Sequence, residues 1–196
     1  MKKIIFLLCF VIFHSCTNIL YKWYGIKDLS HFDEKQHTDF ISSIDTTHVS
    51  FISIVSDAKQ FEKIVDNATD SMQRKIFYQP IQIIYLKNDK IISYHINCYA
   101  GVKSRNLDWN IDNRFYSFPP KTAVDTHNII LSLTQFREVY SDILSNKPYN
   151  VIVFWTLMMK DFSKNAIYTV AENIHTFNMQ DSTDVYLINI DNFFID

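Results

Sequence analysis

The sequence predicts an α/β domain, in which a mixed β-sheet is flanked by helices. Short apolar runs rich in β-branched and aromatic residues alternate along the chain with amphipathic segments of helical period. One run, 150–156 (NVIVFWT), is apolar almost throughout, which is typical of a central strand covered on both faces. The length of 196 residues and a hydrophobic content of 47% fit one domain with its own core.

Each element follows from its local pattern. Helices are predicted where a polar cap precedes apolar residues at helical spacing, and strands where β-branched residues run without a break. In chain order we predict a helix at 30–44 capped by Ser30, a strand at 48–55, a helix at 56–68 capped by Asp57, strands at 80–86 and 90–96, a strand at 129–133, a helix at 134–144, the strand at 150–156, a helix at 163–177 and a strand at 184–191. The strands at 80–86 and 90–96 flank a short turn and are predicted to form a hairpin.

The N-terminal residues predict where in the cell the protein is located. Residues 1–15 combine a basic start with an apolar run too short to cross a bilayer, which indicates a secretory signal peptide. Ser15 and Cys16 end that run, and this pattern resembles the lipobox of bacterial lipoproteins, in which the cysteine carries acyl chains such as palmitate. We therefore expect Cys16 to anchor the protein to a bacterial envelope membrane; a plain signal peptide is the alternative. Residues 16–28 form either a membrane-proximal tether or a segment packed on the domain, which spans 29–196.

Residues 97–128 break the regular pattern. The segment has no stable period and contains Gly101 and the pair Pro119–Pro120. A connection this long is uncommon in compact domains and is often functional. It is rich in the charged and aromatic side chains of recognition surfaces, and the predicted binding residues are Arg105, Asp108, Trp109, Arg114 and His127. The alternative is a loop packed by its own aromatic residues.

Composition excludes several function classes. The chain has only two glycines and therefore no glycine-rich phosphate loop, and its formal net charge of −2 offers no surface for nucleic acid. The histidines show no metal-ligand spacing, so we predict neither a metal nor another cofactor. Beyond Cys16, the only thiol of the processed chain is Cys98, and strand alternation would place it and His95 on opposite faces, against a nucleophile–base pair.

The segment 128–191 resembles the thioredoxin family. Phe154–Trp155 end the apolar strand, a long helix follows, and the next strand ends in Ile-Asn-Ile-Asp at 188–191, as in that family. The resemblance implies a thioredoxin-like mixed sheet in rearranged strand order, because the hairpin, with Pro80 at the position of the family's cis proline, precedes this unit instead of following it. Met159 and Phe162 occupy the two cysteine positions, and neither can perform thiol–disulfide exchange.

The sequence thus predicts a non-catalytic, lipid-anchored domain that binds an envelope protein or ligand. One alternative is an envelope enzyme that uses Cys98, His127 or residues of the 97–128 loop, and another is a structural lipoprotein. Met158 and Met159 are soft ligands suited to Cu(I), but methionines beside a tryptophan more often fill apolar space.

Overall fold

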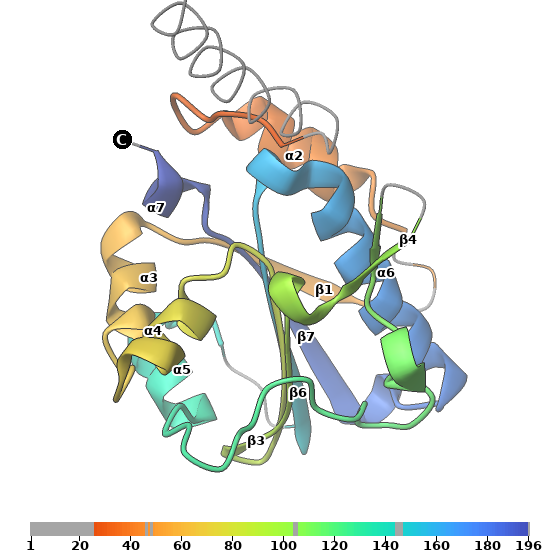
Figure 1. Cartoon of the computed structure of the whole chain (residues 1–196). Coiled ribbons are helices and arrows are strands. Elements are labelled where there is room, and N and C mark those ends of the chain that lie inside the picture. The colour runs from red at the N-terminus through yellow and green to blue at the C-terminus, as the bar shows by residue number, and fades with distance from the viewer. Residues whose placement is uncertain (1–25, 46, 48, 104–105, 144–146, 196) are drawn as a thin grey trace, which may run out of the picture.

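The protein forms a five-stranded mixed sheet with helices packed against both faces (Figure 1). The structure is a computed structural model, and it describes residues 26–45, 47, 49–103, 106–143 and 147–195. The predicted α/β class, with a mixed sheet flanked by helices, is confirmed. The predicted signal peptide, Cys16 and most of the predicted tether lie outside the described residues.

Helices and strands alternate through most of the chain. In order they are α2 (Glu34–Ser42), β1 (Phe51–Val55), α3 (Ala58–Val65), α4 (Ser71–Phe77), β2 (Gln82–Lys87), β3 (Lys90–Ile96), β4 (Gly101–Lys103), β5 (Asn106–Asp108), α5 (Leu133–Val139), β6 (Tyr149–Trp155), α6 (Lys160–Thr176), β7 (Thr183–Asn189) and α7 (Asp191–Phe194). Short 3-10 turns lie between them: η1 (Asn97–Tyr99), η2 (Ile111–Asn113), η3 (Leu157–Met159) and η4 (Gln180–Ser182).

The main sheet has the strand order β1-β7-β6-β2-β3. β1, β7 and β6 run parallel, whereas β2 is antiparallel to both β6 and β3. The β6–α6–β7 unit is therefore a crossover between adjacent parallel strands, and the β2–β3 hairpin continues the sheet from the other side of β6. The position of β6 between two paired neighbours explains why its sequence is apolar on both faces.

The core consists of two layers, one on each face of this sheet. Val153 and Trp155 of β6 point into the layer under α2 and α6, whereas Ile152 and Phe154 point into the layer under α3, α4, α5 and α7. Figure 1 shows α3, α4 and α5 on one side of the sheet and α6 on the other. All four side chains are fully buried, which confirms the predicted central strand.

Local caps set the helix starts. Asp57 caps α3 as predicted, since its side chain accepts a hydrogen bond from the Gln60 backbone N–H at 2.8 Å. The predicted Ser30 cap is wrong: α2 starts at Glu34, because the Asp33 carboxylate accepts from the Gln36 N–H at 2.9 Å. Sequence analysis also missed α4, a helix of 7 residues that is capped by Asp70.

The predicted strand at 129–133 is also wrong. This segment makes one isolated bridge, between Ser132 and Lys90 of β3, and does not join the sheet. Ser132 instead caps α5, with its hydroxyl accepting from the Gln135 N–H at 3.3 Å. Leu131 and Leu133 are buried in the core, which explains the apolar pattern that indicated a strand.

Candidate functional site

The strand–helix corner, residues 155–162 between β6 and α6, is closed by buried polar groups. The Asp191 carboxylate accepts hydrogen bonds from the Thr156 hydroxyl and, at 2.8 Å, from the Leu157 N–H. Its second oxygen accepts from the Asn189 amide at 2.7 Å. The Ser163 hydroxyl donates to the Thr156 carbonyl at 2.9 Å. Asp191 is 1% exposed, so the carboxylate serves to fix the backbone of the corner.

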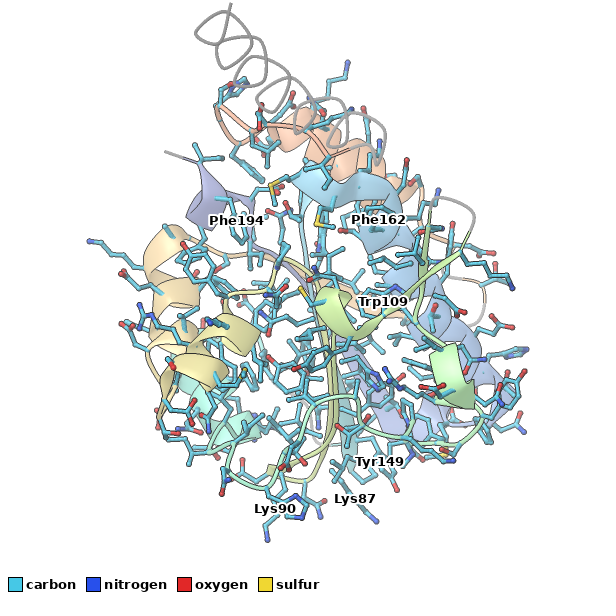
Figure 2. All side chains as sticks on the ribbon, in the orientation of Figure 1. Lys87, Lys90, Trp109, Tyr149, Phe162 and Phe194 are labelled. Atoms are coloured by element: carbon cyan, nitrogen blue, oxygen red, sulfur yellow. The ribbon has the colours of Figure 1, made fainter. Side chains whose placement is uncertain are left out.

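Apolar side chains fill the rest of the corner. Phe162 is buried and Met159 is half-buried, and both pack in the core layer under α2 and α6. Figure 2 labels Phe162 at the start of α6. The Lys27 N–H donates to the Met158 carbonyl at 2.9 Å, so the segment before α2 passes over the corner. Met159 and Phe162, which the resemblance to thioredoxin predicts at its cysteine positions, are therefore packing residues in this structure.

Trp155 is the centre of this packing. Its ring stacks on Phe40 at 4.4 Å and on His37 at 5.4 Å between centroids, both from α2. Burial lowers the pKa of His37, while the charges of Asp191 and Glu34 act in the opposite direction. Burial against Trp155 therefore favours the neutral form of the His37 imidazole.

Cys98 and His95 do not form a nucleophile–base pair. β3 ends at Ile96, and Cys98 lies in η1, where its thiol donates to the Gln79 side-chain carbonyl at 2.9 Å. Burial raises the pKa of the Cys98 thiol, which lowers its thiolate fraction at neutral pH. The His95 Nε2 instead lies 2.9 Å from the Ser93 hydroxyl, inside the protein.

Burial, and secondarily the positive charge of Arg114, lower the pKa of His95 to about 3. The His95 ring also packs against Phe115 of the 97–128 loop, at 4.8 Å between centroids. Because a protonated imidazole would lose its hydration and face a second cation, His95 is held neutral under the loop. His95 therefore has a structural role, as a buried residue on which the 97–128 loop packs.

The residues predicted to bind a partner are spread over the 97–128 loop. Trp109 is 2% exposed and packs in the core layer of α6, where Figure 2 labels it. Its indole is therefore not available to a partner in this arrangement. Arg114 donates to the Tyr99 carbonyl at 2.9 Å and lies 3.4 Å from the Asp112 carboxylate, so it ties the loop to itself.

The other predicted residues do not join Arg114 in one site. The Asp108 carboxylate accepts from the Asn110 N–H at 3.1 Å within a turn. His127 is an exposed side chain that lies 2.7 Å from Asp125 in a separate turn. Arg105 lies outside the described residues.

The described part of the loop is braced on α6. This part contains the antiparallel pair β4–β5 and two 3-10 turns. Among the described residues, the Phe118–Pro119 peptide bond of the loop is the only cis peptide bond. The peptide bond before Pro80 is therefore trans. The buried Asn173 amide of α6 donates to the carbonyls of Phe115 at 3.1 Å and Ser117 at 2.9 Å. The Tyr85 hydroxyl of β2 donates to the Asn173 carbonyl oxygen at 3.1 Å. One side chain thus holds loop, helix and sheet together.

A cavity of about 460 Å³ opens between the braced loop and α6. We call it the loop–α6 pocket; the loop lines it with Asn110, Phe115 and Tyr116, and α6 lines it with Glu172, Asn173 and two threonines. Phe177, the residue that caps the C-terminus of α6, completes the lining. Figure 1 shows the loop segment that carries η2 lying beside α6. The volume lies within the range of roughly 300–1,000 Å³ that small-molecule sites occupy.

Sequence analysis missed these pocket residues. Phe177 is 36% exposed at the C-terminal end of α6, and Tyr116 is 71% exposed. The available signal was Asn173, a polar residue between Val170 and Ile174 in the apolar stripe. A buried amide needs partners, which indicates that another segment covers that turn.

Comparison with known proteins gave no match to a family model, a curated protein or a solved structure. Within the described ranges, no three His, Cys, Asp or Glu side chains gather as a metal site would require. In the same ranges, no helix is long and apolar enough to cross a bilayer.

Proposed function

We propose that the protein is a lipid-anchored, non-catalytic binding domain of the bacterial cell envelope, built on a thioredoxin-like scaffold, and that it binds its partner at the loop–α6 pocket. The observation that carries this proposal is a contrast between two places. The strand–helix corner is filled by Phe162 and closed by the Asp191 hydrogen bonds, whereas the loop–α6 pocket is open and its loop wall is hydrogen-bonded to α6 through Asn173. Preformed concave sites are where proteins bind small ligands and protruding side chains.

The sheet supports the thioredoxin-like scaffold. The strand that ends in Phe154–Trp155, the helix after it and the strand before Asp191 form one crossover unit, β6–α6–β7. The β2–β3 hairpin pairs with β6 in the same sheet, although it precedes the unit in the chain. This arrangement fits the family's parts in a rearranged chain order. With Met159 and Phe162 at the cysteine positions, such a domain would act by binding.

The lipid anchor rests on the sequence at Ser15–Cys16. Acylation of Cys16 would keep the domain at an envelope membrane, on the periplasmic or the outer-membrane face. The enzymatic alternative receives less support, because the Cys98 thiol has a raised pKa and hydrogen-bonds Gln79 in place of a base.

A capture experiment with envelope extract tests the proposed site. The double variant Tyr116→Ala/Phe177→Ala removes two exposed rings from the pocket and should abolish recovery of the proteins or ligands that the tagged wild-type chain retains. Both side chains are exposed, so the melting temperature should change by only a few degrees. Mass spectrometry of the retained material and a melting curve give the two readouts.

Two control variants separate the site from the corner and from the anchor. Met158→Ala/Met159→Ala alters the half-buried corner residues and should keep the partners. Cys16→Ser should leave the protein in the soluble fraction, or unprocessed, and should also keep the partners. If only the corner variant loses its partners, the binding site lies at the corner and the assignment to the pocket is wrong. If Cys16→Ser fractionates like the wild type, the predicted lipid anchor is wrong.

A further inference from the structure

The charges and rings of the loop–α6 pocket point to one class of ligand. Eight residues line the pocket, and Glu172 is the only one of them that carries a formal charge. The described lining contains no lysine, arginine or histidine. The ion pairs of the described residues do not include Glu172. The Glu172 side chain is exposed and, within the described residues, forms no ion pair.

Three aromatic rings line the same cavity. Phe115 is buried and packs against Tyr85 and His95, so its position is fixed. Tyr116 and Phe177 are exposed, and in the described part of the chain neither stacks on another aromatic ring. The face of an aromatic ring carries negative partial charge and attracts cations, and it also contacts the alkyl groups of substituted ammonium ions.

We propose that the loop–α6 pocket binds the ammonium group of an organic cation, with the Glu172 carboxylate balancing its charge and the rings of Tyr116 and Phe177 contacting its alkyl groups. This inference rests on the proposed function and names the ligand class of the same site. An anionic ligand would be repelled by Glu172 and by the ring faces. The ammonium group belongs either to a free small molecule or to a lysine side chain of a partner protein.

The walls are suited to recognition without rearrangement. The Asn110 side chain accepts from the Phe115 N–H at 2.8 Å, and the Asn173 amide holds the Phe115 and Ser117 carbonyls. The loop wall is therefore tied both to itself and to α6 before any ligand arrives. A preformed site loses less conformational entropy on binding, which favours even a small cation.

Titration of the full chain in detergent micelles tests the ligand class. The probes are choline chloride, its uncharged isostere 3,3-dimethylbutan-1-ol, and Nα-acetyl-lysine methylamide, followed by calorimetry and by backbone amide shifts in NMR spectra. Choline or the lysine derivative should bind and shift the amides of residues 110–116 and 169–177, and the isostere should bind more weakly. Which of the two cations binds more tightly distinguishes a small-molecule ligand from a lysine side chain.

Matched variants assign the effect to the pocket. Glu172→Gln keeps the shape of the side chain and should weaken cation binding roughly threefold to tenfold, as should Phe177→Leu. Glu138→Gln, an exposed position on α5 across the sheet, should leave it unchanged. Equal binding of choline and its isostere, no cation binding at all, or unchanged affinity in Glu172→Gln would each overturn the proposal.

The failure of this proposal differs from that of the proposed function. If the Tyr116→Ala/Phe177→Ala variant loses its partners while neither cation binds, the pocket is the binding site and the ligand class is wrong. If cations bind in the pocket while the double variant keeps its partners, the cation site stands and the partner-binding site lies elsewhere.

Discussion

Replacement of Trp155 with alanine should lower the free energy of unfolding by ~3–5 kcal/mol, the usual cost of truncating a fully buried tryptophan. Trp155 is 0% exposed and packs between β6 and α2, where its ring stacks on Phe40 and His37. Its removal leaves a cavity and also loosens the contact of α2 with the corner. Since single domains are stable by only about 5–15 kcal/mol, the loss is a large share of the total.

Chemical denaturation followed by circular dichroism measures this effect. The control is Tyr116→Ala, which truncates an aromatic residue that is 71% exposed and should change stability by no more than about 0.5 kcal/mol. Equal stabilities of Trp155→Ala and the wild type would mean that β6 is not the central buried strand.

Acidification should destabilise the protein through His95. In the folded state its pKa is about 3, well below the ordinary value of 6.5, because the ring is buried and faces Arg114. The unfolded chain therefore binds a proton that the folded chain excludes, so the stabilisation is fully present above about pH 6.5 and falls with pH down to the folded pKa. Between about pH 6 and about pH 4.5 this single group should cost about 2 kcal/mol.

Denaturation curves at several pH values, for the wild type and for His95→Gln, isolate this contribution. The variant should be less stable at neutral pH, because the hydrogen bond to Ser93 changes, but its stability should fall less steeply with acid. The lowered pKa of His37 adds to the slope in the same direction in both proteins. Parallel pH profiles of the two proteins would show that His95 is not held neutral in the folded state.

The sequence predicted those elements whose signals are local. Asp57 followed by Gln60 forms the capping box of α3, and the periodicity of α6 fixes its buried face. The hairpin could be predicted because two apolar runs flank a short turn. In the structure the first residue of that turn, Lys87, ends β2, and the two residues after it form the turn to β3. α4 was missed because its 7 residues offer two helical turns and little periodicity.

The candidate site was harder to predict, because its parts are far apart in the chain. The Asn173–Phe115 hydrogen bond joins residues that are 58 positions apart, and no local pattern states such a pairing. Composition marks the 97–128 segment as unusual, but it does not determine which of its aromatic residues faces inward. Trp109 is buried and Tyr116 is exposed, although both lie in the same loop.

Site-specific photocrosslinking in living cells tests the central claim most directly. A benzophenone amino acid placed at Tyr116 or Phe177 reports what lies against the loop–α6 pocket of the anchored protein. One at Tyr78, an exposed aromatic that follows α4 across the sheet, serves as control. Adducts of the same mass at both pocket positions and none at Tyr78 are the predicted result. Adducts at Tyr78 with none at either pocket position would contradict the assignment of binding to the pocket.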